Sequence, residues 1–169
     1  LGDVYKRQGY GRAVAYGAVT IVNAIACGYG AALGVDLWTE AVVELTDNPG
    51  VVEGKILSDP SEKTDLIEKT VKHVLRYFKL EDMFGAYVET RSNIPIARGL
   101  KSSSVAANSI ALATLSALDR TLDDLTVVKL GVEASIDAGV TVTGAFDDAS
   151  ASYFGNVTVT DNLKRRILK

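Results

Sequence analysis

The chain has 169 residues, of which 47% are hydrophobic and 23% charged, and a formal net charge of -3. This length favours a single domain with a real core, and the acidic balance argues against a duplex nucleic-acid partner, which usually meets a basic face. The single cysteine, Cys27, excludes an internal disulfide. We expect Cys27 to be a small buried hydrophobe in a reducing, cytoplasmic compartment.

Two stretches near the amino terminus have unusual composition. Residues 1–8 (LGDVYKRQ) show no convincing period and precede a sharp change in composition, so we interpret them as a non-native leader. The fold is therefore expected in residues 9–169. Residues 13–35 carry no charge, which leaves a membrane segment as an alternative. Because the run is rich in Gly and Ala and poor in large apolar residues, we expect no membrane partner.

The first half of the chain predicts strands followed by a helix. Residues 12–26 and 35–45 favour strands, Asn48-Pro-Gly is a turn signal, and residues 51–57 can return as a strand. A helix is predicted from Asp59, which can cap it. Its core stripe recurs at helical spacing: Ile67, Val71, Val74, Leu75 and Phe78. His73, the only histidine, falls beside this stripe, and we expect it at an edge with no catalytic role.

The second half mixes further strands and helices. Residues 85–91 favour a strand, and a helix is expected to follow the segment 91–108 through Leu118. A second helix, starting at Thr121 or Asp123, should reach Ile136, and residues 153–160 favour a last strand. The mixture predicts an α+β fold with no regular βαβ alternation.

One segment, Pro95–Val105, reads as a loop that enters a helix. Gly99 permits close approach of a ligand to the backbone, and serines at a helix start offer hydroxyls and unpaired N–H groups to an anion. It is not a Walker loop, because Leu100 separates Gly99 from Lys101. A glycine turn before a serine-capped helix remains the alternative. The candidate phosphate-binding residues are Pro95, Ile96, Ala97, Arg98, Gly99, Leu100, Lys101, Ser102, Ser103, Ser104 and Val105.

The pattern Pro95-x-x-x-Gly99-Leu100-x-Ser102-Ser103 resembles the second conserved motif of the GHMP kinases, the family of galactokinase, homoserine kinase and mevalonate kinase. The resemblance implies that the loop wraps the phosphates of ATP and that Ser103 helps to hold Mg²⁺. Lys101 and Ser104 replace residues usual in the wider family, and this version is similar to archaeal shikimate kinases in particular. Residues 11–25 and 139–152 are similar to two further stretches of that subfamily, in the same order.

The stretch 144–152 contains two adjacent acids, Asp147 and Asp148. The resemblance matches Asp147 with the family's catalytic aspartate and Asp148 with the residue after it, so both are catalytic candidates. A carboxylate near an acceptor hydroxyl can orient it and take its proton, while a solvated turn is the alternative. Glu133 is a second candidate ligand of Mg²⁺, because relatives use a glutamate in that region; an ordinary exposed helix residue is the alternative.

Polar residues in the amino-terminal apolar stretch are candidates for the acceptor. Thr20 and Asn23 carry polar groups there, although internal hydrogen bonding would explain them equally well. The resemblance implies shikimate as substrate, which has three hydroxyls and a carboxylate. Arg12 is a candidate partner of that carboxylate, and Arg91 is another.

The resemblance also implies an architecture and a reaction. We expect the amino-terminal domain of a GHMP kinase, with a mixed β-sheet and helices packed on one face. ATP and Mg²⁺ would serve the phosphorylation of shikimate in aromatic amino-acid biosynthesis. The family's carboxy-terminal domain, which completes the acceptor pocket, is expected to be absent from these residues, so the chain alone should be inactive. Another GHMP kinase, such as a homoserine kinase, and a non-catalytic nucleotide-binding fragment are the alternatives.

Overall fold

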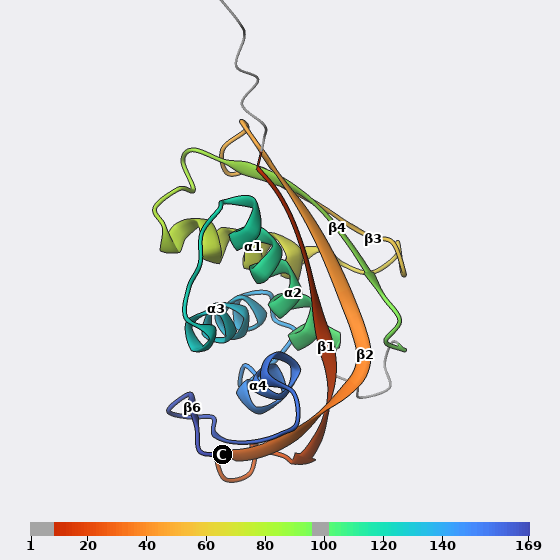
Figure 1. Cartoon of the computed structure of the whole chain (residues 1–169), viewed down its shortest axis with the longest axis vertical. Coiled ribbons are helices and arrows are strands. Elements are labelled where there is room, and N and C mark those ends of the chain that lie inside the picture. The colour runs from red at the N-terminus through yellow and green to blue at the C-terminus, as the bar shows by residue number, and fades with distance from the viewer. Residues whose placement is uncertain (1–8, 96–101) are drawn as a thin grey trace, which may run out of the picture.

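The computed structural model describes residues 9–95 and 102–169. In these residues one mixed sheet carries all the helices on a single face (Figure 1), which confirms the predicted α+β architecture. The elements in chain order are β1 (Tyr10–Val22), β2 (Tyr29–Thr46), β3 (Val52–Ile56), α1 (Asp65–Tyr77), β4 (Gly85–Ser92), α2 (Ser102–Ala117), α3 (Asp124–Asp137), α4 (Phe146–Phe154), β5 (Val157–Asp161) and β6 (Arg166–Ile167).

The long strand β2 organises the sheet. β1 pairs with it antiparallel along one edge. On the other edge, residues 39–46 pair with β4 and residues 29–33 pair with β5, both antiparallel. The parallel pair of β3 and β4 makes the sheet mixed. One continuous strand thus joins the two ends of the molecule (Figure 1).

The apolar residues that suggested a membrane segment are sheet residues. Residues 13–35 form most of β1, a turn and the start of β2. Along β2 the side chains alternate, with Ala41 and Val43 fully buried and Glu44 exposed, as a half-covered strand requires. No helix in the described residues is long and apolar enough to span a membrane.

Helix α2 occupies the centre of the molecule. It packs on β1 and β2 with one side and on α1 and α3 with the other. Most of its residues are therefore buried, which explains its small and apolar sequence. A Cβ added at Gly11 would lie 2.0 Å from the carbonyl oxygen of Ala113, so glycine permits this close approach of strand and helix. The predicted helix through Leu118 is confirmed to within one residue.

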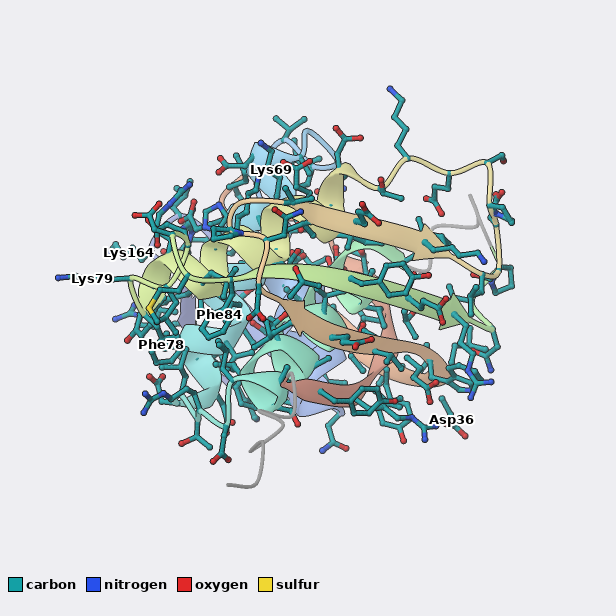
Figure 2. The ribbon with its side chains drawn as sticks, turned by 90° about the horizontal axis from the view of Figure 1, so that it is seen from above. Asp36, Lys69, Phe78, Lys79, Phe84 and Lys164 are labelled. Atoms are coloured by element: carbon teal, nitrogen blue, oxygen red, sulfur yellow. The ribbon has the colours of Figure 1, made fainter. Side chains whose placement is uncertain are left out.

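The hydrophobic core lies between the sheet and the helices. The predicted stripe of α1 is confirmed, since Ile67, Val71 and Leu75 join one buried cluster with residues of β2, β4 and α2. Phe84 packs against that cluster, and Phe78 packs against a second one. Figure 2 shows both aromatic residues at the end of α1, beside Lys79.

Two helix starts test the capping predictions differently. The prediction for Asp59 is wrong, because α1 begins at Asp65, after Thr64. Asp59 Oδ1 instead accepts hydrogen bonds from the backbone N and Oγ of Ser61 at 3.1 and 2.6 Å, which closes a separate turn. Asp123 does cap α3, accepting from the backbone N of Thr126 at 3.0 Å.

Three further local predictions have mixed outcomes. The predicted strand 153–160 is wrong at its start, because α4 continues to Phe154 and left-handed Gly155 and Asn156 (φ 71° and 55°) delay β5 to Val157. Cys27 is exposed in the turn between β1 and β2, so its predicted burial is also wrong. His73 lies at the edge of α1 as predicted, with Nε2 2.7 Å from Asp137 Oδ2 of α3.

Candidate active site

The predicted phosphate loop is described only at its two ends. Residues 96–101 (Ile96, Ala97, Arg98, Gly99, Leu100 and Lys101) lie outside the described residues. Pro95 is exposed before this stretch, and Ser102 and Ser103 form the first turn of α2 after it. Ser104 and Val105 are buried, so the hydroxyls of Ser102 and Ser103 are the more accessible ones.

A pocket of about 90 Å³ opens beside the start of α2. Its walls combine apolar side chains with hydroxyl groups, and Ser102 and Ser103 contribute to them. The first turn of α2 has no acidic residue, so its N–H groups and the helix dipole favour a negatively charged ligand. The other lining residues are Thr39, Ile56, Ser58, Glu62, Lys63, Leu66, Ile67, Thr90, Ser92, Ile94, Ala106, Ile110 and Val140. The pocket suits a ligand with an apolar part and an anionic part.

The two adjacent acids occupy the first turn of α4. Asp147 and Asp148 are only 3% and 2% exposed, so the alternative of a solvated turn is wrong. Left-handed Ala145 (φ 47°) leads the chain into the helix just before them. The positive end of the helix dipole stabilises carboxylates at this position.

Each carboxylate meets a different partner. Asp148 Oδ1 accepts a hydrogen bond from Thr20 Oγ1 of β1 at 2.8 Å. Asp147 Oδ1 accepts one from Asn162 Nδ2 at 2.9 Å. The two aspartates therefore point in different directions, as adjacent helical residues do.

A second pocket, of about 120 Å³, lies at these acids. The structure brings Thr20, Asn23, Asp147 and Asp148 together there, although they come from opposite ends of the sequence. Its other lining residues are Ala24, Ile25, Thr141, Val142, Thr143 and Ala145. Val140 lines the first pocket and the next three residues line the second, so this short connection runs between them. We call the second one the acidic pocket.

Arg12 lies outside the acidic pocket. Its Nε donates to Glu40 Oε2 at 2.8 Å, and Arg91 Nε donates to Glu40 Oε1 at 3.0 Å. Burial alone would raise the pKa of Glu40, but the hydrogen bonds from the two arginines outweigh it and leave that pKa below its ordinary value. Glu40 alternates with the inward-facing Thr39 and Ala41, which places this cluster on the sheet face away from the helices. Neither arginine lines either pocket.

The two candidate metal ligands also separate. Ser103 lines the first pocket, whereas Glu133 of α3 forms an ion pair with Arg165 and lines neither pocket. Within residues 9–95 and 102–169, no group of three or more His, Cys, Asp or Glu side chains could hold a metal ion. The side chains described here thus form no cage of their own for a cation.

Sequence reasoning missed Asn162 and Arg165. Both line a further cavity that shares Ala24, Ile25 and Thr143 with the acidic pocket. The available signal was a polar pair, Asp161-Asn162, at the end of the alternating strand β5. Asn162 bonds Asp147, which lies 15 residues earlier at the start of α4. The sequence alone does not indicate that these two residues meet.

Comparison with known proteins gives a consistent result. Residues 65–156 match the GHMP kinases N terminal domain. The chain is 54% identical over 159 residues to a shikimate kinase of Methanococcoides burtonii, covering 94% of this chain and 55% of that protein. It is 52% identical over 162 residues to a shikimate kinase of Pyrococcus abyssi, covering 95% of this chain and 58% of that protein. The chain spans little more than half the length of these curated relatives.

Among solved structures, the mevalonate kinase of Methanococcus jannaschii superposes with a TM-score of 0.78 at 16% identity, covering 96% of this chain and 56% of that one. A homoserine kinase from Cytophaga hutchinsonii superposes with a TM-score of 0.77 at 19% identity, covering 100% of this chain and 53% of that one. At this identity the likeness concerns the fold.

Proposed function

The chain belongs to the GHMP kinase family, and we propose that it forms the ATP-binding part of a kinase that phosphorylates shikimate. The reaction is ATP + shikimate → ADP + shikimate 3-phosphate. The arrangement that carries this proposal is the pair of pockets separated by residues 140–143, one beside an anion-favouring helix start and one beside two buried acids. Shikimate kinases at 54% and 52% identity support the choice of acceptor.

ATP is assigned to the first pocket. The base would occupy the apolar region between α1, β4 and α2, and the phosphates would lie at the start of α2, against Ser102 and Ser103. We propose that the whole stretch 95–105 wraps the phosphates, with Arg98 and Lys101 balancing their charge. Lys63 also lines the pocket and adds a cation on the side of α1.

The residues present fit Mg²⁺ as a companion of the nucleotide. Mg²⁺ usually keeps several waters and binds through substrate phosphates with few protein ligands, which agrees with the lack of an acidic cage in the described residues. Ser103, at the start of α2, is our proposed protein ligand. Glu133 fits less well, because its carboxylate is paired with Arg165. When bound, the ion would neutralise charge on the phosphates.

Shikimate is assigned to the acidic pocket. Thr20 and Asn23 offer hydrogen bonds to its hydroxyls, and Asp147 takes the proton of the reacting hydroxyl. As that proton leaves, the hydroxyl oxygen bonds to the γ-phosphorus and the bond to the oxygen bridging the β- and γ-phosphates breaks, which releases ADP. Asp148 holds Thr20 in place through its hydrogen bond. Such transfers depend on positioning and charge balance more than on covalent chemistry.

A further domain is proposed to complete the acceptor site. Three apolar residues near the acidic pocket are strongly exposed, namely Ile25 (73%), Val142 (94%) and Leu163 (83%). Exposed apolar surface next to a polar pocket is typical of an interaction surface. The part of the relatives that this chain does not span is long enough to supply the covering domain.

The test is an ADP-release assay with shikimate, homoserine and mevalonate as acceptors. It uses the chain extended to the full length of its relatives, and the 169-residue chain in parallel. We expect the highest kcat/KM for shikimate in the long chain, and ATP binding without turnover in the short one. A higher kcat/KM for homoserine would support a kinase whose acceptor is homoserine and not shikimate. ATP binding without turnover of any acceptor by the long chain would contradict the kinase assignment.

A further inference from the structure

Both oxygens of the Asp147 carboxylate are constrained by neighbouring elements. Oδ1 accepts the hydrogen bond from Asn162 Nδ2 at 2.9 Å. Oδ2 lies over Gly30 of β2, where an added Cβ would be only 2.5 Å from it. Since the residue is 3% exposed, solvent has little part in orienting it. The direction of this carboxylate therefore depends on Asn162 and on the bare backbone of Gly30.

Asn162 is itself held firmly. Its backbone N donates to the carbonyl oxygen of Gly28 at 2.8 Å, which fixes the turn after β5 against the start of β2. Its side-chain Oδ1 accepts a hydrogen bond from Thr160 Oγ1 at 2.6 Å, and Thr160 is fully buried. An ionised carboxylate only accepts hydrogen bonds, so the NH₂ end of the amide must face Asp147. Thr160 holds the opposite end and prevents the amide from turning over.

We infer that Asn162 is a positioning residue, which orients the Asp147 carboxylate toward the acceptor hydroxyl in the acidic pocket; this rests on the proposed function. A neutral amide suits the task, because it directs one hydrogen bond at the carboxylate without placing a positive charge beside the group that accepts the proton. Thr160 is the outer member of the same chain of hydrogen bonds. Neither residue needs to touch the substrate for this effect.

A purely structural role for Asn162, in closing the turn after β5, is the competing explanation. The two roles differ in their dependence on Asp147. Two residues that act through one contact show non-additive effects when both are changed, whereas independent effects add. The decisive experiment is therefore a double-mutant cycle of Asn162→Leu and Asp147→Asn, measured by steady-state kinetics in the chain extended to the length of its relatives.

We expect Asn162→Leu to lower kcat by about tenfold or more, while the KM values for ATP and shikimate change by less than about twofold. In the Asp147→Asn background the same change should cost almost nothing further. Thr160→Val, which removes only the outer hydroxyl, should lower kcat less than Asn162→Leu does. Asn48→Leu, at an exposed turn position, is the matched control and should leave kinetics unchanged.

The outcomes separate the hypotheses. An equal loss from Asn162→Leu in both backgrounds, or a rise in KM with kcat unchanged, would show that Asn162 is structural and overturn the inference alone. If the parent protein prefers another hydroxyl acceptor, the cycle is run with that acceptor and decides the role of Asn162 in the same way. A parent protein that phosphorylates no acceptor would overturn the proposed function, and the inference with it.

Discussion

The first turns of α2 and α4 both point at a pocket, but they are built in opposite ways. The start of α2 has serines and no acidic residue, whereas the start of α4 carries Asp147 and Asp148. At α2 the helix dipole has no carboxylate of its own to interact with in the first turn, which suits an external anion. At α4 the dipole already stabilises two internal carboxylates. The same backbone feature thus favours an external anion in one place and stabilises two internal carboxylates in the other.

The difference teaches that a helix start acquires its role from the side chains of its first turn. It also shows how two neighbouring pockets can differ in the charge that they favour, since an external anion is favoured beside the start of α2 and disfavoured beside the two carboxylates of α4. Residues 140–143 run between the two pockets. Asn108 links α2 to α4, because its Nδ2 donates hydrogen bonds to the carbonyl oxygen of Ala149 at 2.9 Å and to Ser152 Oγ at 3.2 Å. Three changes test this comparison, and a fourth, away from both helix starts, serves as a contrast; they follow in order of expected effect.

Removing the charge of Asp147 should have the largest effect. We expect Asp147→Asn to lower kcat by roughly 10²–10⁴-fold with ATP binding nearly intact, because a general base of this type contributes that much. Asp148→Asn should cost less, since its carboxylate bonds Thr20 and supports the pocket. Rate measurements on the two variants in the long chain check the order. A larger loss for Asp148→Asn would assign the base to Asp148.

Placing an acid at the start of α2 should make it resemble α4. We expect Ser103→Asp to weaken ATP binding by more than about tenfold, because a new carboxylate near the phosphates costs well over the 1.4 kcal/mol that a factor of ten requires. Calorimetric titration with ATP measures the effect. Ser116→Asp, exposed near the other end of the same helix, is the control. Equal binding by parent and Ser103→Asp would remove this helix start from the nucleotide site.

Separating the two helices should reduce stability by a moderate amount. Asn108→Leu leaves the carbonyl of Ala149 and the hydroxyl of Ser152 without their donor in a buried place, which costs about 1–3 kcal/mol. Urea unfolding measures the change. Thr114→Val removes a buried hydroxyl that bonds only within α2 and should cost less. A loss for Asn108→Leu no greater than for Thr114→Val would mean that the link between α2 and α4 contributes little.

The smallest expected effect lies away from both helix starts, at the hydrogen-bonded pair of His73 and Asp137. The hydrogen bond from His73 lowers the pKa of Asp137 below 3.8, with lesser help from Lys69 and Arg76. A lowered carboxyl pKa stabilises the folded state at pH values above 3.8. This stabilisation is lost as the pH falls through the lowered pKa. The melting temperatures of the parent and Asp137→Asn should therefore differ slightly near neutral pH and converge in acid.

The exposed Asp82→Asn variant controls for a simple change of charge. If the difference between the parent and Asp137→Asn instead grows as the pH is lowered, the hydrogen bond between His73 and Asp137 does not act in the direction described. Kinase activity should be unaffected by Asp137→Asn, because the residue lines neither pocket.

Much of the fold could be predicted, because its signals are local. The stripe of α1 and the cap at Asp123 depend on residues within a few positions of one another, and both are confirmed. Predictions were wrong where the same short segment can form either of two local structures. Asp59 closes a turn and starts no helix, and residues 153–154 finish α4 before any strand begins. Sequence alone does not rank such alternatives, since packing against the rest of the chain decides between them.

For the site, the sequence by itself determined the types of residue available: serines at a helix start, two adjacent acids and polar groups in an apolar strand. The tertiary structure decided which of them meet. It joined Thr20 to Asp148 and Asn162 to Asp147, and it turned Arg12 away toward Glu40. The physical reason is that periodicity and capping act over a few residues, whereas a hydrogen bond between distant segments depends on strand register and helix packing, which the whole core sets together.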